Sequence, residues 1–238
     1  MKYLVPMLAA FTLGFAVSTA SAQGPRPAIG LHVAPIGADI GKACTTGPTT
    51  CAGVVTTGPT VPAGGGPAYW VYVVALPLSV DNGVSGVSFG IFYEWNAETY
   101  AGAYLESNGF VNCADLGFFS ASWPQPFSGA TLTFAPAQCD ASIGKDLAVC
   151  GVFQVALYSA SLMQIVANQN GQFGVAKCGT PAQTNLQFPS AAGWVSLGGA
   201  QSSGDSEGCN PCFESCASVA ASRSTWGKIK KTFEGSGE

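Results

Sequence analysis

The stretch from Val84 to Trp95 constrains the fold of this chain most strongly, because its large hydrophobic residues alternate with small or polar ones. One side of the alternation carries Val87, Phe89, Ile91, Tyr93 and Trp95, and the other carries Ser88, Gly90 and Glu94. Successive side chains of a β-strand point to opposite faces of a sheet, so a period of two predicts a half-buried strand. We expect the aromatic side to lie in a core and Ser88 to face solvent.

Two further segments have strong strand character. Asp146–Ser159 alternates with both faces largely apolar, which is typical of a central strand of a sandwich, and we expect it to cover the Phe89 face. Ala68–Val80 is dense in β-branched and aromatic residues and ends before the turn Asp81-Asn82-Gly83. Ala68–Val80 and Val84–Trp95 would then be two consecutive strands, and the turn between them could join them as a hairpin. Pro77 cannot donate to a ladder, which predicts an edge position or a bulge there.

Shorter strand candidates recur along the chain between turns rich in Gly, Asn and Pro. They are Ile29–Val33, Leu162–Val166, Phe173–Cys178 and Gly193–Leu197. Ala97–Leu105 reads as a short helix or a loop crossing, and Gly41–Gly66 reads as largely loop. Many strands at this spacing, without a convincing amphipathic helix in the body, predict an all-β chain folded as an antiparallel β-sandwich.

The N-terminal residues have the pattern of a secretory signal peptide. Lys2 is followed by the apolar run Leu4–Val17 and by the small residues Ala20-Ser21-Ala22. The run is shorter than the roughly 20 apolar residues of a membrane span. We therefore expect cleavage after residue 22, no transmembrane segment in the remaining chain, and an exported protein that resides outside the cell, on its surface or in the periplasm.

The rest of the chain divides by composition into three parts. Residues 23–67 are a Gly/Pro/Thr-rich N-terminal segment, residues 68–198 the β-sandwich domain, and residues 199–238 a cysteine-containing linker with a short amphipathic tail. If the tail is helical, one face carries Trp226, Ile229 and Phe233, while Lys228, Lys230 and Lys231 point largely away from it. The tail then has four interpretations: it docks on the sandwich, makes weak contact with a membrane surface, is recognised by a sorting system, or is simply a frayed end.

Nine cysteines in an exported chain predict disulfides, and the odd number leaves at least one without a partner in the chain. The candidates are Cys44, Cys51, Cys113, Cys139, Cys150, Cys178, Cys209, Cys212 and Cys216. We favour a bridge between Cys44 and Cys51, which closes a short loop, and one between Cys113 and Cys139, which flank short strands.

The cluster Cys209-x-x-Cys212 with Cys216 admits three interpretations. A zinc site would need a fourth ligand, and the only histidine, His32, is far upstream. A thioredoxin-type motif would need a βαβ context, which is missing from the pattern. Structural disulfides, with Cys150 or Cys178 among the partners, fit better, so we predict no metal site and no cofactor.

Composition and motifs also bear on function. Only 9% of residues are charged, the net charge is -4, and the basic residues are dispersed until the tail, so we predict no nucleic-acid partner.

Gly86-Val87-Ser88-Phe89-Gly90 matches the G-x-S-x-G nucleophile elbow, but an elbow needs a strand-to-helix turn and a later histidine, and His32 comes before it. A glycosidase uses two carboxylates that face each other across a cleft. Two of the three glutamates Glu94, Glu98 and Glu106 would have to be placed in this way for the chain to act as one.

Short motifs carry a resemblance to a known family. Val84–Glu94 resembles the early strand of cohesin-like domains, in which a Gly-hydrophobic-x-Phe-x-hydrophobic-x-Tyr-acid pattern recurs. Four further segments make the chain similar to a group of exported proteins from Gram-negative bacteria that end in a Thr-Trp-Gly-x-x-Lys tail: Asn112–Leu116, Val149–Ser159, Gly208–Cys212 and Ser224–Lys230. The chain departs from cohesins in its many cysteines and in Glu94, where an Asp is common, so no binding residues are carried over.

The resemblance implies an Ig-like/cohesin-like β-sandwich with a non-catalytic adhesion or scaffolding role. Our leading hypothesis is accordingly a secreted or cell-surface binding or structural module with a protein or polysaccharide partner. The alternative is an extracellular hydrolase of the esterase or glycosidase type, which would use Ser88 or the glutamates.

Overall fold

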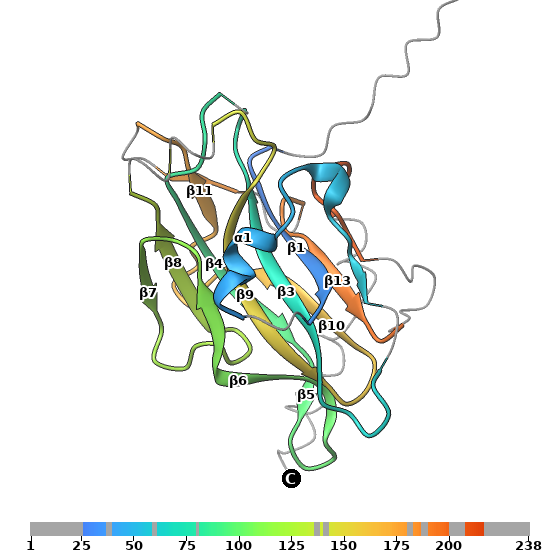
Figure 1. The fold of residues 1–238 in the computed structure, drawn as a ribbon. Helices are drawn as coiled ribbons and strands as arrows, with labels where there is room; N and C mark the ends of the chain where they lie inside the picture. The colour runs from blue at the N-terminus through green and yellow to red at the C-terminus, as the bar shows by residue number, and fades with distance from the viewer. Residues whose placement is uncertain are drawn as a thin grey trace, which may run out of the picture.

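Two β-sheets packed face to face make up the protein, as seen in a computed structural model (Figure 1). The structure describes residues 26–36, 40–58, 61–79, 81–135, 139, 143–179, 183–186, 190–199 and 208–216. All but one of the pairings between strands are antiparallel, so the predicted fold class, an antiparallel β-sandwich, is confirmed.

The first sheet has five strands in the order β1-β3-β9-β6-β5. Their bounds are Ala28–Pro35 for β1, Pro67–Leu76 for β3, Ala148–Leu157 for β9, Ala101–Asn112 for β6 and Trp95–Asn96 for β5. The expected strand at Ile29–Val33 is therefore β1, and the expected central strand is β9. The segment predicted to precede the sandwich contributes a full strand to it.

The second sheet follows the order β12-β11-β4-β10-β13-β2, and β8 and β7 branch from β4. Its strands are β12 (Gln183–Asn185), β11 (Gly174–Ala176), β4 (Gly86–Tyr93), β10 (Ser161–Val166), β13 (Trp194–Leu197), β2 (Thr57–Gly58), β8 (Gly129–Thr133) and β7 (Leu116–Phe119). Only β13 and β2 run parallel. Because β4 pairs with β8 on one side and with β10 and β11 on the other, it lies in the middle of the sheet.

Three short helical turns lie in the stretch predicted as loop: η1 (Ile40–Lys42), α1 (Ala43–Thr46) and η2 (Cys51–Gly53). The chain just after α1 lies against β9 and β3, because a Cβ atom on Gly47 would come within 2.7 Å of Val149 and 2.9 Å of Tyr72. A bond of 3.0 Å between the hydroxyls of Thr46 and Tyr72 ties α1 to the sheet. This cover explains why β9 is apolar on both faces.

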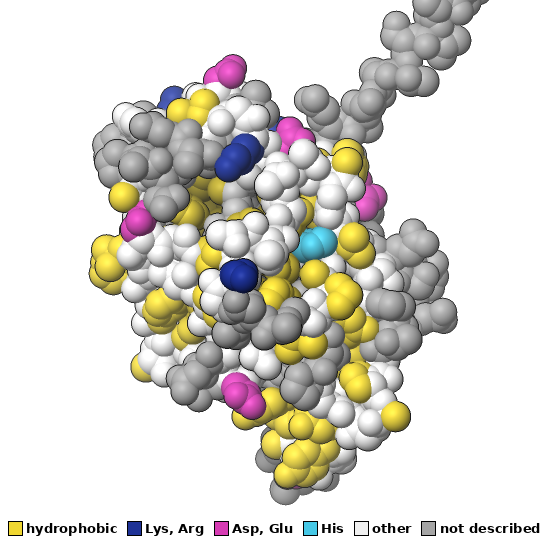
Figure 2. Space-filling model, viewed as in Figure 1, with side chains coloured by type: hydrophobic (Ala, Val, Ile, Leu, Met, Phe, Trp, Pro, Cys, Tyr) yellow, Lys and Arg dark blue, Asp and Glu magenta, His cyan; other side chains and the backbone are white. Residues whose placement is uncertain are grey.

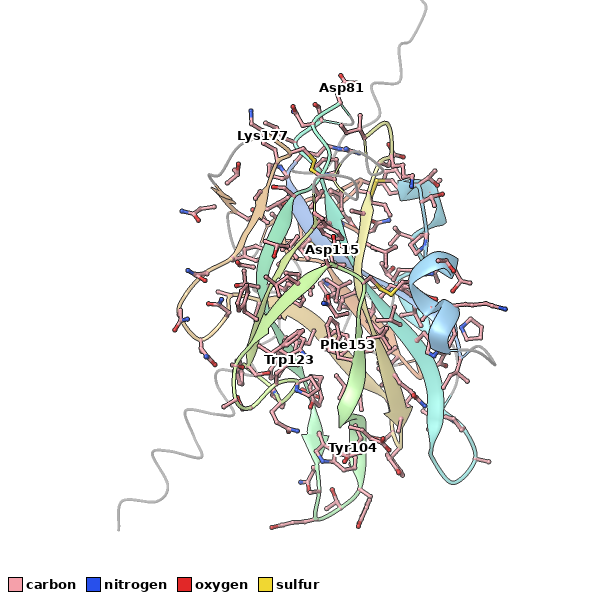
Figure 3. The ribbon with its side chains drawn as sticks, turned by 60° about the vertical axis from the view of Figure 1, so that its left-hand side comes forward. Asp81, Tyr104, Asp115, Trp123, Phe153 and Lys177 are labelled. Carbon is pink, nitrogen blue, oxygen red and sulfur yellow. A yellow bond between two sulfur atoms is a disulfide. The ribbon has the colours of Figure 1, made fainter. Side chains whose placement is uncertain are left out.

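The core lies between the two sheets. Phe89 is completely buried, and its ring contacts Trp123 at 5.8 Å in an edge-to-face arrangement. Trp123, which is half-buried, in turn contacts Phe153 of β9 at 5.6 Å, and the two side chains lie side by side (Figure 3). The prediction that the Phe89 side of β4 is buried toward β9 is confirmed, except that Trp95 leaves the core and is only half-buried.

Some predictions about the strands are wrong. The two consecutive strands β3 and β4 lie in different sheets, because the turn at Asp81–Gly83 carries the chain across the sandwich instead of closing a hairpin. β3 is an interior strand between β1 and β9, and it simply ends at Leu76, before Pro77. Residues 97–105, expected as a helix or a loop crossing, form a turn and the beginning of β6.

Four disulfides hold the protein together, three between segments 39 to 161 residues apart in the sequence and one that closes a loop with a separation of 7 residues. They are Cys44–Cys113, Cys51–Cys212, Cys139–Cys178 and Cys209–Cys216. The predicted pairs Cys44–Cys51 and Cys113–Cys139 are both wrong, since each of these cysteines bonds elsewhere. The cluster near the C-terminus is structural, as expected, but Cys178 is not its partner, and Cys150 is buried and unbonded.

The Cys51–Cys212 bond fastens the N-terminal segment to the C-terminal one across 161 residues of sequence. The predicted signal peptide, residues 1–22, and the amphipathic tail with Trp226, Ile229, Phe233, Lys228, Lys230 and Lys231 lie outside the described residues.

Candidate functional site

The nucleophile-elbow hypothesis for Ser88 does not fit the structure. Ser88 lies in the middle of β4, not at a strand-to-helix turn, and its hydroxyl forms a 3.0 Å bond with that of Thr131. The prediction that it faces solvent is also wrong. Its side chain points to the outer face of the sheet, but neighbouring strands flank it on both sides and only 1% of the residue is exposed.

His32, the only histidine, lies on β1 in the other sheet and has a structural role. Its Nδ1 accepts a hydrogen bond from the backbone N–H of Val55 at 2.9 Å, and its ring lies 5.4 Å from that of Tyr72. Burial lowers the pKa of His32 to about 4, because the charged form loses its hydration. The ring is therefore neutral at pH 7 and holds the chain before β2 against β1.

The three glutamates considered as glycosidase acids lie away from the surface hollow described below. Glu94, Glu98 and Glu106 are all exposed, and they lie around the β5–β6 hairpin, at one end of the sandwich. None of them lines that hollow. Of the two hydrolase mechanisms considered from the sequence, the structure therefore contradicts the nucleophile elbow at Ser88.

A surface hollow of about 180 Å³ lies elsewhere, on the second sheet. One wall consists of strand β7 and the start of β8, with Phe118, Phe119, Ser120, Gly129, Ala130 and Thr131. The other wall is the loop between β10 and β11, with Asn168, Gln169, Asn170 and Gln172. We call it the β7–β8 hollow. Sequence analysis did not single out any of these residues.

The pairing of strands shows which face the hollow occupies. Phe118 pairs with Thr131, and Thr131 pairs with Ser88, so these three side chains share one face of the sheet. Phe89, the next residue on β4, points into the core, so the shared face is the outer one. The ring of Phe118 is 60% exposed there.

Asn168 organises the loop wall from within. Its side-chain oxygen accepts hydrogen bonds from the backbone N–H groups of Asn170 at 3.0 Å and Gln172 at 2.9 Å. Its side-chain nitrogen donates to the side-chain oxygen of Gln172 at 3.3 Å. Only 8% of Asn168 is exposed, whereas Gln169 and Asn170 project into solvent. The loop is therefore held in place by its own buried amide.

Two glycines let this loop lie directly on the sheet. A Cβ atom on Gly90 of β4 would come within 2.6 Å of the carbonyl oxygen of Ala167. A Cβ atom on Gly129 of β8 would come within 2.3 Å of the Cβ of Asn168. Real Cβ atoms do not approach so closely, so the shape of the hollow depends on the absence of side chains at these two positions.

Exposed apolar side chains continue beyond the hollow. Leu116, Phe118, Phe119 and Phe127 are all more than two-fifths exposed, although they fall within one short stretch of chain. Hydrophobic side chains gather along the left-hand border of the molecule, over β7 and β8 (Figure 2). Phe127 also has φ of 64°, a costly conformation for a bulky residue, and such strain recurs at functional surfaces.

A second group of aromatic side chains lies at the lower end, over the β5–β6 hairpin (Figure 2). The ring of Trp95 contacts those of Tyr100, Tyr104 and Tyr158, at 6.1, 5.0 and 5.5 Å respectively. These rings pack against one another, and Trp95, which is half-buried, also packs against the edge of the core. Among the described residues, Tyr100 is the most exposed of the large hydrophobic side chains, at 66%.

Metal-ligating side chains and an unbonded thiol also occur in the part of the chain that the structure describes. No group of three or more His, Cys, Asp or Glu side chains there could hold a metal ion. Burial raises the pKa of the unbonded Cys150 thiol, which favours the unreactive protonated form. Within the same residues, no helix has the length and apolar character needed to cross a membrane.

The fold and the hollow define a disulfide-bonded β-sandwich with an uncharged, aromatic-walled site on the outer face of one sheet. Its backbone is similar to that of a cohesin module from a Clostridium perfringens family 33 glycoside hydrolase, with a TM-score of 0.39. The sequence identity is 11%, over 72% of this chain and 96% of the cohesin chain. No protein-family model matches the chain, and no curated protein matches it.

Proposed function

We propose that this protein is an exported, non-catalytic binding module that holds its ligand at the β7–β8 hollow. The observation that carries the proposal is the construction of the hollow. A buried asparagine fixes its loop wall, two glycines let that wall rest on the sheet, and an exposed phenylalanine stands opposite. Concave sites with an apolar wall and a few fixed polar groups are the usual form of binding sites in proteins.

The four disulfides support export. Disulfides persist in extracellular and periplasmic proteins and are rare in the reducing cytosol. The proposed signal peptide would supply the route, and the proposed relation to exported proteins with a cohesin-like sandwich agrees with a role in binding. We retain a partner at the cell surface as part of the proposal.

Adsorption to washed envelopes of the producing cells tests the proposal. The purified protein is mixed with envelopes, sedimented and quantified, beside the variant Phe118→Ala. We expect adsorption of the wild type and a loss of at least about fivefold in the variant, as for truncation of a residue central to an interface. Phe213→Ala is the matched control, because Phe213 is 51% exposed but does not line the hollow. Equal adsorption of all three proteins would contradict the proposal.

A further inference from the structure

We propose that the ligand of the β7–β8 hollow is a neutral sugar unit of a polysaccharide. This inference rests on the proposed function and adds the chemical class of the ligand. Three properties of the hollow carry it, namely its charge, its free hydrogen-bonding groups and its size.

The hollow is lined entirely by uncharged residues. A site for an acidic sugar, a phosphate or a charged peptide side chain would offer an opposite charge, because burying an unpaired charge is costly. The net charge of the chain, -4, further disfavours an acidic polymer. A neutral ligand can enter this hollow without the cost of burying an unpaired charge.

Hydrogen-bonding groups in the hollow are amides and hydroxyls, each able to both donate and accept. The side-chain amides of Gln169 and Asn170 are exposed and make no hydrogen bond within the described residues. Ser120 and Thr131 place hydroxyl groups on the opposite wall. The Ser120 hydroxyl already accepts from the backbone N–H of Gly129 at 3.1 Å and that of Thr131 bonds to Ser88 at 3.0 Å, but a hydroxyl has one donor and two acceptor positions, so each can make a further bond. Sugar hydroxyls also donate and accept at once, so a polyhydroxylated ring can satisfy both walls together.

The ring of Phe118 supplies the remaining contact. An aromatic face carries partial negative charge, and the C–H groups on one face of a pyranose ring carry partial positive charge, so the two stack favourably. Phe118 is sufficiently exposed for such stacking. The free amides facing this ring would then fix the orientation of the sugar.

The volume of the hollow sets the extent of the ligand. Clefts that enclose a whole drug-sized molecule measure roughly 300–1,000 Å³. A hollow of about 180 Å³ holds a single ring, with the rest of the chain lying on the open surface. Such a contact is weak, with a Kd of roughly 1 mM, and becomes effective where many copies of the sugar are linked.

Affinity electrophoresis in native gels tests the inference on the intact, oxidised protein. Gels contain dextran, hydroxyethylcellulose, galactomannan or xylan as neutral polymers, and alginate or polygalacturonate as acidic ones. We compare the wild type with Phe118→Ala and with the double variant Gln169→Ala/Asn170→Ala. Asn185→Ala and Tyr100→Ala serve as controls, because Asn185 is an exposed amide and Tyr100 an exposed ring outside the hollow. Unchanged thermal unfolding shows that each variant is folded.

We expect at least one neutral polymer to retard the wild type and both controls. Each hollow variant should need at least about fivefold more polymer for the same retardation. Three results would overturn the inference: retardation by acidic polymers alone, retardation by none of the polymers, or retardation that Phe118→Ala leaves unchanged. Loss of retardation in Tyr100→Ala, with Phe118→Ala unaffected, would assign binding to the other aromatic cluster and would also overturn it.

Treated envelopes separate this inference from the proposed function. Periodate cleaves the vicinal diols of sugars, whereas proteinase K removes exposed proteins. We expect periodate to abolish adsorption and proteinase K to leave it. If proteinase K alone abolishes an adsorption that depends on Phe118, the ligand is a protein, so the sugar inference fails while the binding function stands. If untreated envelopes adsorb no protein, the binding function itself fails.

Discussion

Asn168→Ala isolates the group that holds the loop wall of the hollow. The substitution keeps the Cβ atom that packs against Gly129 and removes only the side-chain amide. The backbone bonds of the loop, from Asn168 N–H to the carbonyl of Gln172 and from Gly171 N–H to the carbonyl of Asn168, are not touched. Any effect therefore reports on the hydrogen bonds of one amide.

The expected cost follows from the bonds that are lost. Two backbone N–H groups, those of Asn170 and Gln172, lose their acceptor. A neutral hydrogen bond contributes about 1 kcal/mol net, and both residues are exposed, so water can replace part of the loss. We expect the loop to open more readily by about 1–2 kcal/mol, while the global free energy of unfolding changes by less than about 1 kcal/mol, because the opening is local.

Native-state hydrogen exchange measures this opening directly. Protection of the amides of Asn170 and Gln172 should fall about tenfold, since 1.4 kcal/mol corresponds to a factor of ten. Asn168→Asp is the matched control, because a carboxylate still accepts both bonds and the Gln172 amide can rotate to donate to it. The loop should stay protected in that variant.

Two results would refute the reasoning. Protection that stays within about twofold of the wild type in Asn168→Ala would mean that the loop is held by its backbone alone. Equal loss of protection in Asn168→Asp would mean that shape, and not acceptance of the two N–H bonds, is what Asn168 supplies.

Three other predictions concern stability, each measured by urea unfolding. Phe89→Ala should cost about 3–5 kcal/mol because the ring is fully buried, and a loss below about 1 kcal/mol would place that face outside the core. Burial lowers the pKa of His32 from 6.5 to about 4, so only the unfolded chain gains a proton between these values. The free energy of unfolding should fall by about 1–2 kcal/mol as the pH drops through that window, since water screens part of the ring, and His32→Asn, which keeps an acceptor for Val55, should abolish this part of the pH dependence. Replacing Cys51 and Cys212 together by Ala should cost about 5 kcal/mol, because the bond closes 161 residues of chain, and a cost below about 1 kcal/mol would contradict the assignment.

Local patterns predicted most of the strands. Alternation identified β4 and β9, since a buried face imposes a period of two on any strand that carries one. The same patterns say nothing about which sheet a strand joins. β3 and β4 are adjacent in sequence and lie in different sheets. The hydrophobic face of a strand is covered by the opposite sheet whichever strands flank it, so the alternation in β4 would be the same if β3 were its neighbour in the sheet.

The disulfides were unpredictable for a related reason. Short loops are the easiest to close, which favoured Cys44–Cys51, but the native pairs are set by which strands and turns the folded sheets bring together. α1 lies beside the end of β6, so Cys44 meets Cys113, and η2 lies beside the C-terminal segment, so Cys51 meets Cys212. Sequence separation carries no information about such tertiary neighbours.

The hollow was missed because its residues are ordinary one by one. Phe118 lies on a short strand, Asn168 and Asn170 in a polar turn, and Gly129 beside a proline-rich bend, and no motif links them. Only the pairing of β7, β8 and β4 brings them to one face. The exposure of two phenylalanines on the short edge strand β7 is visible only in the structure, where apolar side chains that a fold leaves in water often mark an interaction surface.

The G-x-S-x-G sequence has a different meaning in this fold from the one the motif implies. Gly86 brings β4 close to β8, since a Cβ there would lie 2.9 Å from the carbonyl oxygen of Leu132. Gly90 admits the loop that Asn168 organises, and Ser88 bonds to Thr131, which lines the hollow. All three small residues serve close packing of β4 against its neighbours. Gly90→Ala should therefore disturb the loop and weaken ligand binding. If the motif were a catalytic elbow, replacement of Ser88 would instead be the change with the large effect.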